Sequence, residues 1–381
     1  MGVSLAGIGA VTSYGWGVTD LWSGALSSRT SIKTYKTYGE FDNPFLALIN
    51  DPDPDSRDSL YTRVLKYIVD EALEDAKSKG WKQNNKVALI HSSVYGDERA
   101  MEQFHQDKWN DHEFKIKYAY LMPSTIANRI ARAHNFNGPF LQINSMCASG
   151  SAAILHAKML IDAGIVDSAL VLNGDVCATP NHVKGFTHMG VADTTIQPED
   201  WSRPFQENTR GLIGAEGAVA MLLTKDSSDK YYDVLGGAMT NDAFSLTRID
   251  PAYTQLRRCI EEGLINANVN QEAVSTYNSH GPGTSQCNMA EKFLVETYFK
   301  DAQVYSFKPL VGHCMSAAAG VELVLEAMAQ KNKIIPAPKV YANPIIDNLL
   351  DGPTERKKGI GAKVSIGLGG TNTVLLLDAA A

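Results

Sequence analysis

The chain has 381 residues and a formal net charge of −7; 44% of its residues are hydrophobic and 20% are charged. These values are typical of a globular protein with two or three domain-sized units, and the acidic balance argues against nucleic acid as its main partner. Its five cysteines form no CxxC pair, which argues against a disulfide framework or a zinc site and favours a cytoplasmic protein.

The N-terminal stretch GVSLAGIGAVTSYGWGV is apolar, but Gly, Ser and Thr interrupt it and no basic segment precedes it. We therefore expect a strand and a turn here, with no signal peptide and no membrane span.

Short runs rich in β-branched residues alternate with segments of helical length along the chain. Strands are predicted at 2–9, 86–93, 140–145, 168–176, 217–224, 232–240, 275–281, 303–308, 362–369 and 373–378, and helices at segments such as 61–79 and 254–267. This alternation predicts an α/β fold with largely parallel sheets.

Two segments resemble each other. MCASGSAAILHAKMLIDAG begins at Met146 and HCMSAAAGVELVLEAMAQ begins at His313, so Cys147 and Cys314 take matching places. Each segment follows a predicted strand and is apolar on nearly every face, as in a buried helix. The pair suggests two related halves that share a central helical layer.

Cys147 follows a predicted strand and opens the first of these helices. A helix N-terminus lowers the pKa of a thiol, which would make Cys147 a nucleophile. A packed core cysteine is an equally good interpretation of this stretch alone, and Cys314 is a rival candidate.

Two histidines stand where they can face a cleft. His280 ends a predicted strand in NSHGPGT, although a turn histidine bonded to backbone is the simpler interpretation of that motif alone. His313 opens the second helix, where the helix N-terminus keeps an imidazole neutral and able to donate a hydrogen bond. Lys308 precedes it by five residues and, taken alone, is a solvated loop charge.

The segment SIGLGGTNT, at 365–373, is a glycine-rich turn that can offer backbone N–H groups to an oxyanion. It is not GxGxxG, and GIGAVT near the N-terminus lacks the third glycine, so a dinucleotide site is not expected.

The order of these motifs is more specific than any one of them. In this order of motifs the chain resembles the β-ketoacyl-ACP synthases of fatty-acid and type II polyketide synthesis over nearly its whole length. Three further segments carry the same resemblance: GPFLQINSMCASG, RPFQENTRGLIGAEGA and GHCMSAAAGVE. The resemblance implies an α/β thiolase fold of two similar halves, at 1–240 and 241–381, in five α-β-α-β-α layers.

The resemblance also implies roles for individual residues. Cys147 would take an acyl group from a carrier thioester, with an oxyanion hole made by the backbone N–H groups of Cys147 and Leu368. His280 and His313 would stabilise the enolate formed when malonyl-carrier protein loses CO2. The remaining implied residues support the histidines, as Lys308 and Glu291, or contact substrate and pantetheine, as Thr284, Phe186, Leu368, Gly369, Gly370 and Thr371.

Some residues depart from the family pattern. Leu368 replaces the gate phenylalanine, with Ile366 as its neighbour, Pro282 replaces a threonine that contacts pantetheine, and Asn288 replaces an aspartate. These departures favour a synthase of specialised metabolism.

The implied function is a decarboxylative Claisen condensation on an acyl carrier protein that bears phosphopantetheine, with no permanently bound cofactor and no metal. Alternatives are acyl transfer to a non-malonyl acceptor, a non-catalytic chain-length partner, and the catalytic subunit of a heterodimer with a chain-length-factor-like chain. The family otherwise implies a homodimer.

Overall fold

Ten strands occur where the sequence predicts them. The computed structural model describes residues 2–84, 86–108, 110–122, 124–192, 194, 202–225, 227 and 229–379. The ten strands are β1 (Val3–Thr12), β7 (Val87–Ser92), β8 (Phe140–Ile143), β9 (Ser168–Asp175), β10 (Gly217–Lys225), β11 (Tyr232–Asn241), β12 (Val274–Asn278), β13 (Gln303–Tyr305), β16 (Ile360–Gly367) and β17 (Thr371–Ala379). The predicted helices at 61–79 and 254–267 are also present, as α2 (Leu60–Ser78) and α9 (Thr254–Ala267).

The strands repeat one topology. Their order is β13-β12-β16-β17-β11-β1-β10-β9-β7-β8, with β2 (Gly15–Trp16) beside β1. The five strands on either side of the β11–β1 junction follow the same order, third-second-fourth-fifth-first. In both sets the first two pairings are parallel and the last two antiparallel. The prediction of largely parallel sheets is therefore wrong. In the second set only residues 368–370 join the last two strands, and so short a link allows only an antiparallel return.

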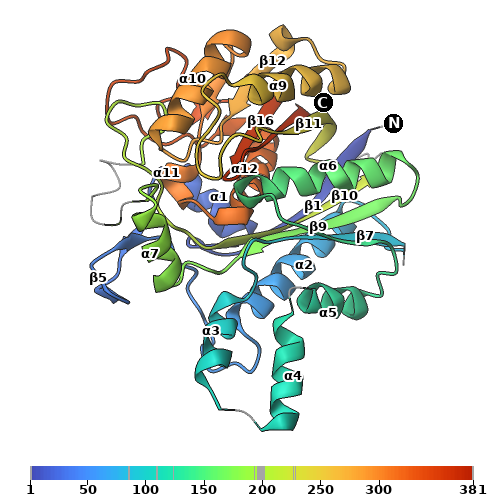
Figure 1. Ribbon diagram of the computed structural model, residues 1–381. Coiled ribbons are helices and arrows are strands. Elements are labelled where there is room, and N and C mark those ends of the chain that lie inside the picture. The colour runs from blue at the N-terminus through green and yellow to red at the C-terminus, as the bar shows by residue number, and fades with distance from the viewer. Residues whose placement is uncertain are drawn as a thin grey trace.

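The two sets of strands meet along one short seam and enclose two helices. β1 and β11 pair only through Val3 with Val234 and Ser4 with Asp233. Figure 1 shows α6 (Ser149–Asp162) and α12 (Ala318–Asn332) between the two sets, with α2 and α5 (Thr125–His134) outside one and α9 and α10 (Ser285–Tyr298) outside the other. Separate apolar clusters fill the spaces between these layers. The arrangement is the five-layer α-β-α-β-α one.

The two central helices approach each other closely at small residues. A Cβ atom on Gly150 of α6 would lie 2.7 Å from the backbone N of Gly320 of α12, so glycine is required at 150. α12 is buried along most of its length, as predicted, but α6 is not buried all round, because Met159 is 64% exposed near its C-terminal end.

A 3-10 turn precedes each central helix, and the two turns correct the predicted match between the halves. The turns are η1 (Met146–Ala148) and η3 (Met315–Ala317), and each begins with a methionine at positive φ, 51° and 47°. Superposing the turns pairs Cys147 with Ser316, and Cys314 falls just before η3. The expectation that Cys314 matches Cys147 was two residues out of register.

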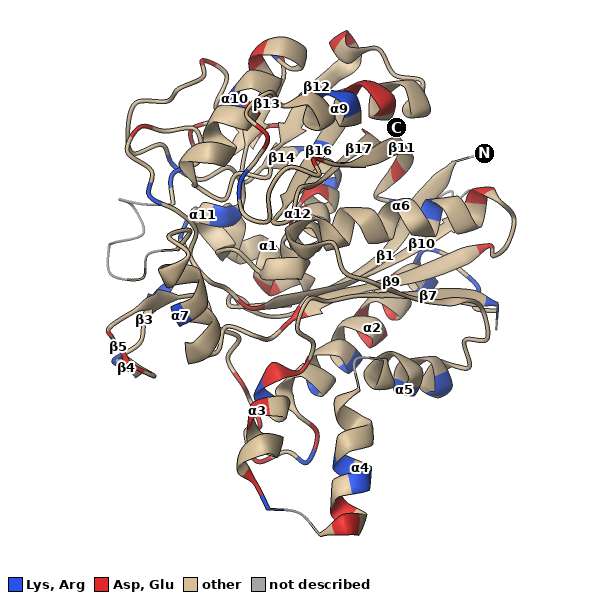
Figure 2. Cartoon of the chain, viewed as in Figure 1, with Lys and Arg blue, Asp and Glu red and all other residues tan. Residues whose placement is uncertain are grey.

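The other elements are short or lie at the edge of these layers. They are α1 (Val18–Leu26), β3 (Lys33–Thr34), β4 (Thr37–Tyr38), β5 (Phe41–Asp42), β6 (Phe45–Leu46), α3 (Glu98–Gln106), α4 (Asp111–Leu121), α7 (Pro180–His188), η2 (Gln271–Ala273), α11 (Lys308–Val311), β14 (Ile334–Ile335) and β15 (Thr354–Glu355). Charged segments of both signs are interspersed over α3, α4 and α9 (Figure 2). In the described part of the chain, no helix is both long and apolar enough to cross a membrane.

Candidate active site

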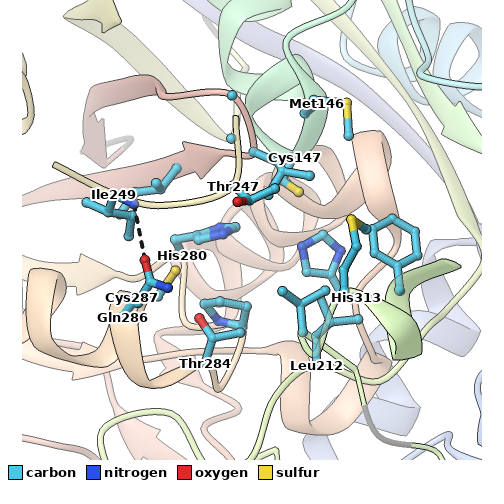
Figure 3. A pocket seen from close by; sticks show the side chains of 18 of the residues that line it. Met146, Cys147, Leu212, Thr247, Ile249, His280, Thr284, Gln286, Cys287 and His313 are labelled. Carbon is cyan, nitrogen blue, oxygen red and sulfur yellow. Dashed lines mark hydrogen bonds between the residues drawn. The ribbon is translucent and has the colours of Figure 1, made fainter. Parts of the chain in front are cut away.

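A cavity of about 370 Å³ opens where η1, η3 and the turn between β16 and β17 come together. Cys147, His280 and His313 line it and face the same space (Figure 3). Cys147 lies in the half of the chain that forms the first set of strands. His280 and His313 lie in the other half, 133 and 166 positions further along the chain. The structure thus brings together three side chains that the sequence could only place in order.

Cys147 lies in η1, directly before α6. Burial raises the pKa of its thiol, and the Lys308 charge with the backbone N–H groups of Leu368 and Cys147 only partly offsets this. The expectation of a thiol pKa lowered by the helix N-terminus is therefore corrected: loss of solvent outweighs the helix and the nearby cation. The two N–H groups nevertheless converge on the sulfur.

The glycine turn packs directly on the Cys147 segment. A Cβ atom on Gly367 would lie 2.6 Å from the carbonyl oxygen of Ser145, so only glycine lets the turn approach this closely. Gly369 and Gly370 have φ values of 92° and 89°, and the Gly370 N–H donates to the Gly367 carbonyl at 3.1 Å. This tight turn carries the Leu368 N–H to the thiol. Leu368, Gly369 and Gly370 line the cavity, whereas Thr371 begins β17 outside the lining.

His313 is held through its backbone and through one ring nitrogen. Its N–H donates to the Ile213 carbonyl at 2.8 Å, and its carbonyl accepts from Ala215, so the LIGAEG segment fixes its place. Its Nδ1 accepts the backbone N–H of Met315 at 3.1 Å. Burial, followed by the Lys308 charge, lowers the pKa of His313 to about 3. The ring is neutral at pH 7, with its proton on Nε2.

His280 follows β12 and is held by its own backbone. Its N–H donates to Glu291 Oε1 at 2.6 Å, and the next N–H, of Gly281, donates to Oε2 of the same carboxylate at 2.7 Å. Burial and then the charge on Lys308 place the pKa of His280 well below its ordinary value. Nδ1 of the ring is buried without a hydrogen-bond partner among the described residues. Glu291 therefore lies behind the cavity wall and supports His280.

Lys308 lies in the same supporting layer and is 1% exposed, which rules out a solvated loop charge. Its ammonium donates to the carbonyl of His280 and, at 2.7 Å, to Glu322 Oε1. Glu322 and Lys363 also belong to this layer, and neither was predicted from the sequence. Their signal was a charged residue inside an apolar helix and an apolar strand, where a charge is rarely buried without a partner.

The remaining predicted contact residues surround the cavity. Phe186 in α7 and Thr284 before α10 line it, as does Pro282. Asn288 lies behind the lining, where its side chain accepts the Phe205 N–H at 3.1 Å. The residues that the structure describes include no group of three or more His, Cys, Asp or Glu side chains able to hold a metal ion.

Cys314 lies apart from the cavity. It is fully buried, and its thiol donates to the Glu216 carbonyl at 3.6 Å. Burial raises the pKa of this thiol to about 12, so it is a packed core cysteine.

Comparison with known proteins gives the same fold and family. A likeness to the AntDE:AntF complex, a type II PKS acyl-carrier protein with its ketosynthase bound to the hexaketide, has a TM-score of 0.86 at 19% identity over 99% of this chain and 98% of that one. The ketosynthase ApeO in complex with its chain length factor ApeC, from Xenorhabdus doucetiae, is also similar. Its TM-score is 0.83 at 21% identity, and the match covers 100% of this chain and 98% of that one. These likenesses confirm the thiolase fold.

The sequence matches extend over nearly the whole chain. The 3-oxoacyl-[acyl-carrier-protein] synthase 2 of Coxiella burnetii is 25% identical over 407 aligned residues, covering 99% of this chain and 98% of its own. The model of the β-ketoacyl synthase N-terminal domain matches residues 2–229, and that of the C-terminal domain matches residues 231–340. The chain therefore belongs to the β-ketoacyl synthase family.

Proposed function

We propose that the protein joins an acyl group held on Cys147 to a malonyl unit by decarboxylative Claisen condensation, with both substrates carried on the phosphopantetheine of an acyl carrier protein. The observation that carries the proposal is the convergence of the Cys147 thiol, two neutral imidazoles and the Leu368 N–H on one cavity.

In the first half-reaction the Cys147 sulfur attacks the carbonyl carbon of the carrier thioester. The N–H groups of Cys147 and Leu368 are placed to donate to the oxygen that becomes negative, and such donors are among the largest contributions to acyl transfer. The new carbon–sulfur bond replaces the bond to pantetheine, and the thiol proton leaves with the pantetheine thiol. The raised pKa of Cys147 keeps this nucleophile protonated until a substrate arrives.

In the second half-reaction the malonyl thioester loses CO2 and its electron pair becomes an enolate. The Nε2–H of His313 donates to the enolate oxygen, since Nδ1 is already an acceptor. The enolate carbon then attacks the acyl carbonyl, the bond from that carbon to the Cys147 sulfur breaks, and the thiolate released takes a proton from solvent. Loss of CO2 supplies the carbanion, so the site needs no strong base and both imidazoles can stay neutral.

We further propose that each chain consists of two halves, 1–240 and 241–381, and that two such chains form a homodimer in the cytoplasm. β8 ends the strand order, so one edge of the sheet is open to a partner. Phe140 on this strand is 36% exposed and Met159 on α6 is 64% exposed, and such apolar edges are suited to a two-fold contact. A chain-length-factor-like subunit is the alternative occupant of this edge.

Product analysis tests the function. The protein is incubated with an acyl-loaded carrier protein, with and without malonyl-carrier protein, and the carriers are analysed by mass spectrometry. We expect a 3-oxoacyl carrier only when malonyl is present, and none with the Cys147→Ala variant. An acyl group passed to an amine or alcohol without malonyl would support the transfer alternative and contradict condensation.

A further inference from the structure

A second buried lysine lies beside the Lys308–Glu322 pair. Lys363 belongs to β16 and is 0% exposed. Its ammonium is 2.6 Å from Glu322 Oε2, while Lys308 occupies Oε1 of the same carboxylate at 2.7 Å. One carboxylate thus lies between two ammonium groups, and the three side chains come from β16, α12 and α11.

Both ammonium groups also bind main-chain carbonyls on either side of the His280 Cα atom. Lys363 donates to the Ser279 carbonyl at 2.9 Å, and Lys308 donates to the carbonyl of His280. Glu291 accepts the N–H groups of His280 and Gly281 from the other side. Four consecutive main-chain groups around His280 are therefore fixed by buried charged side chains.

Burial of these three charged side chains has a large unfavourable free energy, which their mutual contacts must offset. Burying a charge is unfavourable unless hydrogen bonds and a counter-charge compensate it, and each of these ammonium groups has both. A second lysine adds no catalytic atom to the cavity, because Lys363 is not part of its lining. Its contacts are made with Ser279, with Glu322 and, at 3.0 Å, with the carbonyl of its neighbour Val364.

We propose that Lys363 is a positioning residue for the second half-reaction: acting with Glu322 and Lys308, it holds the Ser279–His280 main chain so that the His280 ring stays directed at the malonyl thioester. This inference rests on the proposed function. Acyl transfer to Cys147 uses the thiol and the Leu368 turn, so it depends far less on the place of His280. A misplaced donor in a preorganised site slows its own step and leaves others intact.

The charges support the same assignment. Lys308 and Lys363 bring two ammonium charges close to His280, and the carboxylates of Glu322 and Glu291 lie beside them. Burial and then the Lys308 charge lower the pKa of His280 most, and the Lys363 charge adds to this effect. The group therefore favours a neutral imidazole as well as a fixed one.

The test compares two half-reactions in one preparation. Formation of acetyl-CoA from malonyl-CoA measures decarboxylation, and mass increase of the Cys147 peptide with hexanoyl-CoA measures acylation. The variants are Lys363→Met, which keeps the length of the side chain without its charge, and Lys363→Gln, which keeps one donor. The matched control is Arg356→Met, because Arg356 is a buried cation that pairs with Glu326, one turn further along α12, and reaches Thr276 of β12, away from His280.

We expect the ratio of decarboxylation to acylation to fall by about tenfold or more in Lys363→Met, by less in Lys363→Gln, and to stay within about twofold in Arg356→Met. A ratio near that of the wild type in folded Lys363→Met, a fall in Lys363→Gln as large as in Lys363→Met, or an equal fall in Arg356→Met would overturn the inference. A wild-type protein that neither acylates Cys147 nor releases CO2 when the acyl and malonyl groups are carried on an acyl carrier protein would instead contradict the proposed function, so the two failures are distinguishable.

Discussion

The backbone N–H of Met315 donates to Nδ1 of His313 at 3.1 Å. Because Met315 begins the turn that leads into α12, the fold itself selects the tautomer of the histidine. The neutral ring carries its proton on Nε2, and that N–H is available to the substrate. Donation to the enolate oxygen in the second half-reaction depends on this hydrogen bond.

Removing the His313 donor should separate the two half-reactions. We predict that His313→Ala lowers decarboxylation of malonyl-CoA by about 10²–10³-fold, as for loss of one oxyanion donor, and leaves acylation of Cys147 within a few-fold. His313→Gln should recover part of the loss, since its amide can donate near the position of Nε2. Equal loss of acylation and decarboxylation in both variants would sink the assignment of His313 to the second step.

Close packing of Gly367 on Ser145 predicts a position that tolerates no side chain. Gly367→Ala should displace the Leu368 N–H from the thiol, cost about 1–3 kcal/mol of folding free energy and greatly slow acylation of Cys147. Gly185→Ala is the matched control, because nothing lies within 4 Å of its added methyl group and the position is within helix α7. It should stabilise the protein by about 0.5–1 kcal/mol. Unchanged acylation in Gly367→Ala, measured beside urea unfolding of both variants, would show that the turn does not position the donor.

The raised pKa of Cys147 gives a pH dependence with a definite sign. A thiol is neutral below its pKa, so alkylation of Cys147 by iodoacetamide should rise about tenfold per pH unit and still be rising above pH 8.5. Lys308→Met removes a charge that lowers this pKa and should slow the reaction further at fixed pH. Mass spectrometry of the Cys147 peptide gives the rate. A plateau at or below pH 7 would mean that the free enzyme holds a thiolate.

The free energy of unfolding should depend on pH through a histidine that lies outside the active site. His91 is fully buried on β7 beside the Tyr61 hydroxyl, and burial lowers its pKa to about 4. The unfolded chain binds this proton near pH 6.5 while the folded chain does not, so stability falls as the pH drops from 6.5 towards 4. Between pH 7 and pH 5 the loss from His91 is about 2 kcal/mol.

The variant His91→Gln should remove this part of the pH dependence. Urea unfolding at pH 7 and pH 5 then gives a smaller difference than in the wild type, whatever the absolute stability of the variant. The same difference in both proteins would mean that the pKa of His91 is the same in the folded and unfolded states.

Leu368 gives a prediction about substrate size. Its backbone N–H is independent of its side chain, so Leu368→Phe and Leu368→Ala should both acylate Cys147 with acetyl-CoA at near wild-type rates. With decanoyl-CoA we expect the Phe variant to be slower by about tenfold and the Ala variant to be faster. Identical chain-length profiles for all three proteins would remove Leu368 from the acyl path.

Motif order and alternation predicted the strands and the members of the site. The resemblance carried by that order named Cys147, His280, His313 and the Leu368 turn, and the structure places all four around one cavity. The direction of the strands was missed, since alternation does not show whether the last strand of each half returns antiparallel. The register of the two halves was also misjudged, because shared Cys and Ser letters concealed the true match of Cys147 with Ser316.

Charges and electrostatics were the harder part. A helix start suggests a lowered thiol pKa, but how deeply the thiol is buried depends on the β16–β17 turn, which is more than 200 residues further along the chain. Lys363 and Glu322 belong to segments that appear apolar, and only the fold shows that one carboxylate is placed between two ammonium groups. Such a group depends on contacts among β16, α11 and α12 that no local pattern contains.

Covalent capture on Cys147 tests the central claim most directly. The protein is incubated with a panel of acyl-loaded carrier proteins, and the peptides containing Cys147 and Cys314 are weighed before and after malonyl-carrier protein is added. We predict an acyl group on the Cys147 peptide alone. Addition of malonyl-carrier protein should remove this acyl group, release CO2 and form a 3-oxoacyl carrier. An acyl group on the Cys314 peptide, or one on Cys147 that malonyl-carrier protein does not remove, would contradict this prediction.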